Sequence, residues 1–167
     1  TLHGSSAASD VYKRQAIWAA KSKKFETIQT SFNLVEQKAR YELFKLVDDN
    51  DLGLIAKRPI ANGAWRANEN PNVHSAPTNY AEEYFRRAGI MTRLGNITDE
   101  PEDRIMTSMG YIFSFNDIDV GIIGTQNPKH LLSNIDMYSE CLKISREVIN
   151  ELNRRFDEFG KNWDQRT

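Results

Sequence analysis

Apolar and polar positions along this chain follow two different periods, and the changes between them predict strands separated by helices. The segment 25–32 alternates apolar and polar residues, as a half-buried strand does. The run 39–47 places its apolar residues at helical spacing, and Gly53 is expected to end that helix. A second strand is predicted at 54–56, and Pro59 ends its regular pairing.

The remaining pattern predicts further helices around a third strand. Helices are expected over 16–24 and 80–88, and another after Thr98, which is interpreted as an N-cap because acidic residues follow it. The apolar run 120–123 predicts a buried third strand. A last helix is expected after Ser145, with an apolar face at helical spacing.

The third strand leads into a glycine turn and a capped helix start. Gly124 permits a tight turn, Asn127 is a good N-cap, and Pro128 suits the first position of a helix running to about residue 138. Free backbone N–H groups at such a helix start, with the positive end of the helix dipole behind them, favour an anion such as phosphate. Most capped helices bind nothing, so this pattern alone does not assign a function.

Strands that alternate with helices predict an α/β fold with a parallel sheet. Three parallel strands leave two open edges, which indicates part of a larger sheet. A small doubly wound sheet and a piece of an eight-stranded barrel both agree with the pattern, and in both the ligands bind at the carboxyl ends of the strands. The long loop 61–78, which carries Trp65, Arg66 and His74, is expected on that side.

Composition narrows the classes of function. The 167 residues are 40% hydrophobic and 27% charged, which is ordinary for a soluble globular domain. The net charge of -1 gives no basic surface for nucleic acid, and no apolar run approaches the length of a membrane span. A single cysteine, Cys141, excludes an internal disulfide and, with no histidine pair at metal spacing, leaves no metal site to predict. We expect a cytoplasmic protein.

Three stretches, 25–35, 53–63 and 120–135, resemble in order and spacing the signature stretches of the aldo/keto reductases. The resemblance implies the C-terminal part of a (β/α)8 TIM barrel: about three parallel strands with their helices, plus a C-terminal helix. Members of the family move a hydride between NADP(H), or less often NAD(H), and an aldehyde, ketone or alcohol.

The resemblance places this chain at the sixth, seventh and eighth strands of the barrel. The catalytic Asp, Tyr, Lys and His of the family belong to earlier strands, so Tyr41, Lys57 and His130 are not nominated as catalytic. The chain is therefore expected to be the cofactor-binding half of an NAD(P)H-dependent reductase, inactive by itself, with a small carbonyl or alcohol substrate for the parent protein. The alternative is a non-catalytic nucleotide-binding or scaffold protein of the same fold.

The resemblance also implies contacts with the nicotinamide and the pyrophosphate. Gln29 corresponds to a glutamine that hydrogen-bonds the nicotinamide carboxamide. Lys57 stands where many members stack an aromatic ring on the nicotinamide. Ile60 and Asn62 stand where the chain cradles the pyrophosphate, and Arg58 beside them is a candidate for added positive charge.

Contacts with the adenosine end are implied on the third stretch. Gly124, Thr125 and Gln126 occupy the loop that holds the adenosine phosphate, and Asn134 matches an asparagine that contacts the adenine. Gly124 replaces a frequent lysine, and His130 a frequent arginine, which reduces the charge available for a 2′-phosphate. NADP(H) is the expected cofactor, with NAD(H) as the alternative.

Residues 1–15 do not continue the family pattern. Their small, polar composition is typical of a linker or of a foreign segment joined to the reading frame. The expected division is therefore a non-family segment at 1–15 and a partial barrel domain at 16–167.

Overall fold

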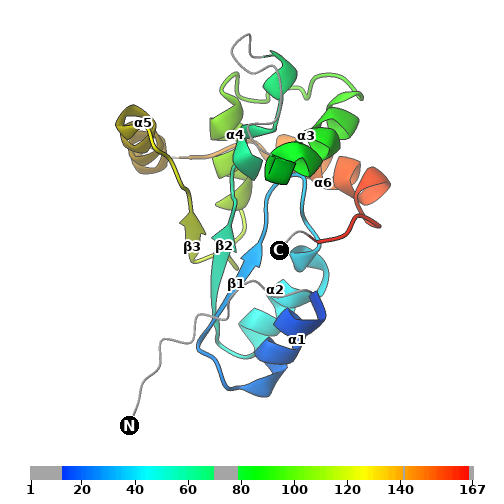
Figure 1. Cartoon of the computed structure of the whole chain (residues 1–167), viewed down its shortest axis with the longest axis vertical. Helices are drawn as coiled ribbons and strands as arrows, with labels where there is room; N and C mark the ends of the chain where they lie inside the picture. Colours follow the sequence, from blue (N-terminus) through cyan, green and yellow to red (C-terminus); the bar gives the residue numbers. More distant parts are fainter. Residues whose placement is uncertain (1–12, 70–78, 141, 166–167) are drawn as a thin grey trace.

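Three parallel strands form the centre of the molecule in a computed structural model that describes residues 13–69, 79–140 and 142–165. They are β1 (Thr27–Ser31), β2 (Gly53–Lys57) and β3 (Val120–Ile122), paired in that order (Figure 1). Each predicted strand is confirmed, within two residues at either end. His74 and Cys141 lie outside the described residues.

The register of the sheet aligns polar residues near its carboxyl edge. Gln29 pairs with Ile55, which pairs with Val120, and two residues further on Ser31, Lys57 and Ile122 form the corresponding row. Because side chains alternate between the faces of a strand, these six residues share one face. The opposite face is mostly apolar, and Ile28, Leu54 and Ala56 are buried there.

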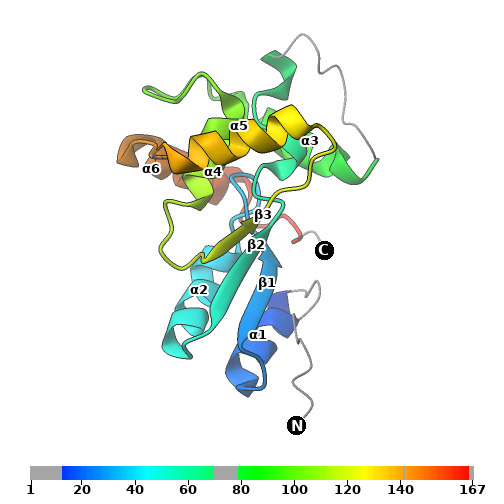
Figure 2. The same cartoon turned by 90° about the vertical axis from the view of Figure 1, so that its left-hand side faces the viewer.

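Two helices cover the apolar face beside the amino ends of the strands. They are α1 (Lys13–Ser22) and α2 (Ala39–Asp49), which pack on each other and on β1 (Figures 1 and 2). Above them, Phe32, Phe44, Tyr111 and Phe115 form an aromatic cluster with ring centroids 4.8 to 5.9 Å apart. This cluster ties the end of β1 to α2 and to the segment before β3.

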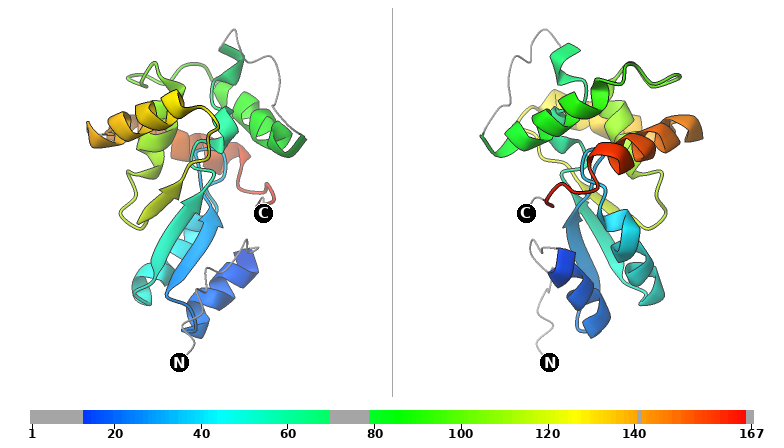
Figure 3. Two further views of the ribbon diagram at one scale, coloured as in Figure 1. Left: turned by 60° about the vertical axis from the view of Figure 1, so that its left-hand side comes forward. Right: turned by 90° about the vertical axis from the view of Figure 1, so that its right-hand side faces the viewer.

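The other helices lie toward the carboxyl ends of the strands (Figure 1). They are η1 (Ala61–Gly63), η2 (Ala67–Glu69), α3 (Asn79–Thr92), α4 (Arg104–Ile112), α5 (Pro128–Ser139) and α6 (Arg146–Phe159). After α6 the chain turns back, and Gln165 Nε2 donates to Thr30 Oγ1 of β1 at 2.9 Å (Figure 3). None of the helices within the described residues is long and apolar enough to cross a membrane.

Helix ends follow the capping chemistry of the sequence at two positions and depart from it at two. Asn127 and Ser145 cap α5 and α6 as predicted, each accepting a hydrogen bond from a backbone N–H. Thr98 was the wrong cap for α4, because Asp103 accepts from two amides there and the acidic residues before it precede the helix. The prediction that Gly53 ends α2 is also wrong: α2 ends at Asp49 and Gly53 already begins β2.

The third strand is not buried as the apolar run predicted. Val120 and Ile122 are each 48% exposed, whereas Ile28 of β1 and Leu54 of β2 are fully buried. The helix that follows, α5, has no buried residue and stands apart from α3 and α6 beside β3 (Figures 1 and 2). Tyr138 of α5 makes an edge-to-face contact with Phe113, which follows α4, with the ring centroids 5.0 Å apart.

Two helical glycines provide a matched test of this packing. A Cβ on Gly110 of α4 would lie 2.6 Å from Ile144 Cγ2, whereas a Cβ on Gly89 of α3 would meet nothing within 4 Å. We expect Gly110→Ala to lower the free energy of unfolding by about 1 to 3 kcal/mol through overpacking. Gly89→Ala should raise it by about 0.5 to 1 kcal/mol, since alanine is the better helix former. Urea unfolding followed by tryptophan fluorescence measures both, and equal effects would contradict the packing.

Candidate functional site

A cleft of about 1380 Å³ opens between the loops that follow β2 and β3 and the start of α4. It contains eight of the ten residues for which a cofactor contact was predicted. These are Lys57, Arg58, Ile60, Asn62, Gly124, Thr125, His130 and Asn134. Segments separated by some 70 positions in the sequence thus meet at one site, at the carboxyl ends of adjacent parallel strands.

One wall of the cleft is the turn 58–63, in which four residues are left-handed. Arg58, Ala61, Asn62 and Gly63 have φ values of 58°, 47°, 55° and 73°. Left-handed backbone is costly for residues with a Cβ, and such residues persist where surrounding contacts fix them. Ala61 is fully buried, so the turn is packed against the protein.

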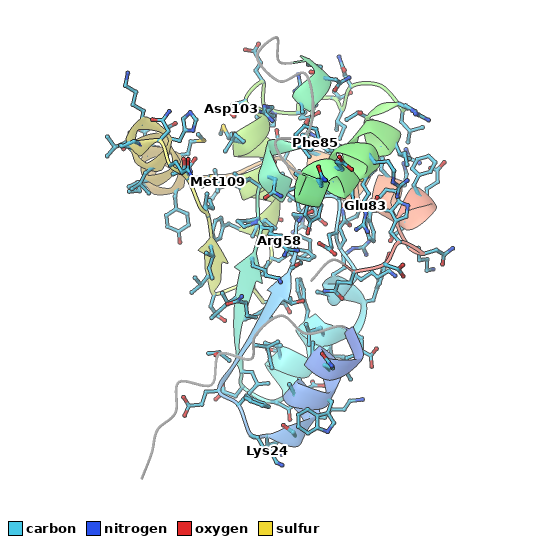
Figure 4. All side chains as sticks on the ribbon, in the orientation of Figure 1. Lys24, Arg58, Glu83, Phe85, Asp103 and Met109 are labelled. Atoms are coloured by element: carbon cyan, nitrogen blue, oxygen red, sulfur yellow. The ribbon has the colours of Figure 1, made fainter. Side chains whose placement is uncertain are left out.

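Hydrogen bonds hold this turn from both ends. Asn33 Nδ2, in the loop after β1, donates to the carbonyl oxygen of Arg58 at 3.0 Å. The guanidinium of Arg104, at the start of α4, donates to the carbonyl oxygen of Gly63. Figure 4 shows Arg58 at the end of β2, beneath α3, and Asp103 at the start of α4. The loop after β1 and the start of α4 therefore both hold this wall.

The opposite wall is the loop from β3 into α5, and it differs from expectation in one respect. The amides of Asn127, Lys129 and His130 are already paired, with Thr125 Oγ1, Asn127 Oδ1 and the Asn127 carbonyl oxygen. The prediction of free N–H groups is wrong for these three amides, because Thr125 and the cap residue Asn127 accept their hydrogen bonds. Gly124 faces open space, with nothing within 4 Å of an added Cβ.

Lys57 forms the floor of the cleft at the end of β2. Lys57 is only 8% exposed. Burial, and secondarily the positive charge of Arg58, lowers the pKa of the Lys57 ammonium to about 8. Lysine at this position therefore supplies an apolar stem and an amine that titrates near neutral pH.

Basic residues of the segments after β2 and of the start of α4 line the cleft, and acidic residues lie among them. Arg66 lies in the long loop predicted to overlie the cofactor, and it does line the cleft. Trp65 beside it is instead buried, with its indole N–H donating to Glu100. Arg104 and Ser133 also line the cleft and were not predicted, because α4 was assigned an earlier start and Ser133 carries no motif. Glu69, Glu102 and Asp103 add acidic side chains to the lining.

Two predicted contacts lie outside this lining. Gln29 is on the uncovered face of β1, in the row with Ile55 and Val120, one row below Lys57. Gln126 is exposed beside Thr125. Their proposed contacts with a cofactor stay predictions. Within the described ranges, no group of three His, Cys, Asp or Glu residues could hold a metal ion.

Comparison with known proteins agrees with this geometry. The profile of the aldo/keto reductase family matches residues 4–155. The chain belongs to the aldo/keto reductase family. No curated protein sequence matches this family member significantly. A domain boundary was expected after residue 15, but helix α1 extends across that position and the family match begins at residue 4. The foreign origin of residues 1–15 stays a prediction.

Solved aldo/keto reductase structures share the fold at low identity. An aldo-keto reductase from Bacillus halodurans in its holo form superposes with a TM-score of 0.63 at 12% identity, covering 87% of this chain and 46% of that one. A glycerol dehydrogenase from Gluconobacter oxydans gives 0.65 at 10%, covering 94% and 50%. This aldo/keto reductase chain thus spans about half the length of those relatives, and its three-strand sheet is part of a TIM-barrel fold, as predicted.

The lowered pKa of Lys57 predicts a pH dependence of stability. Between the folded-state value near 8 and the unfolded value near 10.5, the unfolded chain binds more protons, so stability rises with pH. Relative to Lys57→Met, the unchanged protein should gain about 1 kcal/mol in free energy of unfolding from about pH 7.5 to 9.5.

Lys45 is the control for that measurement. Its hydrogen bond to Asp49 on the surface of α2 raises its pKa, so Lys45→Met should show no such gain in this range. Urea titrations of the three proteins at both pH values measure the difference. A flat difference for Lys57→Met would show that its amine is solvated.

Proposed function

We propose that the cleft binds the dinucleotide of an NAD(P)-dependent aldo/keto reductase, and that this chain forms the cofactor-binding part of that enzyme. The observation that carries the proposal is the convergence of eight predicted contact residues on one cleft of sufficient volume. A cleft of this size accommodates a ligand larger than a typical small molecule. NADP(H) is the proposed cofactor, with NAD(H) as the alternative.

The donors present fit an anionic dinucleotide. Arg58, Arg66, Arg104 and the Lys57 ammonium bring positive charge to one side of the cleft, where a pyrophosphate would bind along the left-handed turn. Gly124 leaves room for close approach of a ligand to the backbone on the other side. Ser133 and Asn134 of α5 offer a hydroxyl and an amide beside His130, which suits the adenosine end.

When bound, the nicotinamide supplies a hydride for reduction of a carbonyl, or accepts one from an alcohol. The residues of this chain would hold and orient it. Lys57 and Ile122 would form the floor of the cleft, and the row of Gln29, Ile55 and Val120 would face the interior of the complete barrel. Proton transfer is assigned to the Asp, Tyr, Lys and His that the family resemblance places on other strands, so turnover is expected only of the whole barrel.

The same geometry supports a second candidate, a nucleotide-binding or scaffold protein without catalysis. The exposed apolar residues of β3 and α5 favour the reductase, because they form a face that further barrel strands would cover. A cytoplasmic location, a small carbonyl or alcohol substrate, and the absence of nucleic-acid partners stay predictions with either candidate.

Binding of the nucleotide is tested by titrating the full chain with NADPH and with NADH by calorimetry. We expect saturable binding at one site, tighter for NADPH. Asn134→Ala should weaken NADPH binding about fivefold through loss of one ligand hydrogen bond.

Asn150→Ala is the matched control, because Asn150 is an exposed asparagine on α6 outside the cleft. It should leave the affinity unchanged. Equal loss in both variants, or no binding of either nucleotide by the unchanged chain, would contradict the proposal. Carbonyl reduction by the isolated chain would instead contradict the assignment of proton transfer to other strands.

A further inference from the structure

A chain of buried polar side chains connects the cleft to α3. The Arg58 guanidinium donates from one nitrogen to Ser31 Oγ at 3.3 Å and to the Tyr84 hydroxyl at 3.2 Å. The Tyr84 hydroxyl donates in turn to Glu36 Oε2 at 2.5 Å. These residues come from the end of β1, the loop after it, the end of β2, and α3. We call Glu36, Tyr84 and Arg58 the relay.

The far end of the relay is fixed by a second arginine. The Glu36 carboxylate lies 3.8 Å from the guanidinium of Arg87, and both side chains are 2% exposed. Arg87 also donates to Glu83 at 2.7 Å and to the backbone carbonyl of Asp164 at 2.5 Å. Its guanidinium lies 5.2 Å from the centre of the Trp163 ring. The C-terminal segment after α6 therefore supports α3 at the point where the relay ends (Figure 3).

Burying these charges is expensive unless every partner is in place, and a fully apolar contact between α3 and the sheet would cost less. The relay nevertheless consists of polar side chains, and its last residue, Arg58, has a strained backbone. Arg58 has a φ of 58°, and its carbonyl oxygen accepts from both Asn33 Nδ2 and the amide of Ala61. The loop after β1 thus holds Arg58 twice, by its backbone through Asn33 and by its side chain through Glu36 and Tyr84.

We infer that Glu36 and Tyr84 are positioning residues for the nucleotide cleft. They do not line it. They hold the Arg58 guanidinium against Ser31, and this fixes the left-handed turn 58–63 that forms one wall of the cleft. The inference rests on the proposed function, since it assigns a role to residues behind the site that binds the dinucleotide.

Tyr84→Phe in the full chain tests the inference, because it removes one hydroxyl and leaves the ring that packs between α3 and the sheet. NADPH affinity should fall about tenfold, as expected when a hydrogen bond to a charged group is lost. Hydrogen exchange of the amides of Arg58 and 60–64 should become faster, since the Arg58 side chain then loses one of the contacts that hold it.

Tyr111→Phe is the matched control. Tyr111 is also fully buried, and its hydroxyl donates to Asn153 Oδ1 at 2.7 Å, away from the cleft. It should lower thermal stability about as much as Tyr84→Phe and leave NADPH affinity unchanged. A role in stability alone would give the two variants the same behaviour, and this would overturn the inference.

Coupling to Arg58 separates positioning from a general loosening of the fold. In an Arg58→Met background, Tyr84→Phe should cause no further loss of NADPH affinity, because the side chain it holds is gone. Additive losses would overturn the inference. If Tyr84→Phe does not fold, Glu36→Gln tests the same step, since it removes the charge and keeps the size. Failure of the unchanged chain to bind NADPH overturns the proposed function as well, whereas normal binding by Tyr84→Phe overturns only the positioning role.

Discussion

The parallel register of β1, β2 and β3 is the constraint on which the rest of this structure depends. Pairing of Ser31 with Lys57 and of Lys57 with Ile122 brings the three carboxyl ends to one edge. The loops that follow β2 and β3 therefore lie close together, although they are far apart in the sequence. The turn, and the loops that form two walls of the cleft, begin directly after that row, as is usual for parallel α/β folds.

Local chemistry predicted the elements well, because each carries its own signal. Alternation identified β1, helical spacing identified α2 and α6, and Asn127 with Pro128 identified the start of α5. The predicted start of α4 was wrong because the acidic residues after Thr98 resemble a first helical turn. In the structure Asp103 caps the helix, and Arg104 beside it contacts Gly63, a residue 41 positions away that no local pattern contains.

Exposure and site lining were less predictable, for a related reason. The apolar residues of β3 have the composition of a buried strand, yet burial requires a second layer that the described part of the chain does not supply. The cleft residues at the ends of β2 and β3 were predicted through the resemblance to aldo/keto reductases, because they lie within two of the family's signature stretches. Arg104, and Glu36 and Tyr84 of the relay, were not assigned through any such signature. Tyr84 and Glu36 are 48 positions apart, and each alone is an ordinary helix or loop residue.

The shape of the cleft, which we propose binds the nucleotide, thus depends on residues that lie behind its lining. In the wall formed by residues 58–63, Arg58 and 61–63 are left-handed, and Pro59 and Ala61 are buried. Polar contacts from the loop after β1, from α3 and from α4 hold this wall. The wall at α5 is exposed, and backbone amides at its helix start are already hydrogen-bonded within the loop. A ligand would therefore meet side chains there, and open space beside Gly124. The most direct test of this account is a titration of the isotope-labelled full chain with NADP⁺, observed as backbone amide shifts by NMR. The account predicts saturable shifts in 57–63 and 122–134 and little change in α1 and α2; shifts confined to α1 and α2, or none at all, would contradict it.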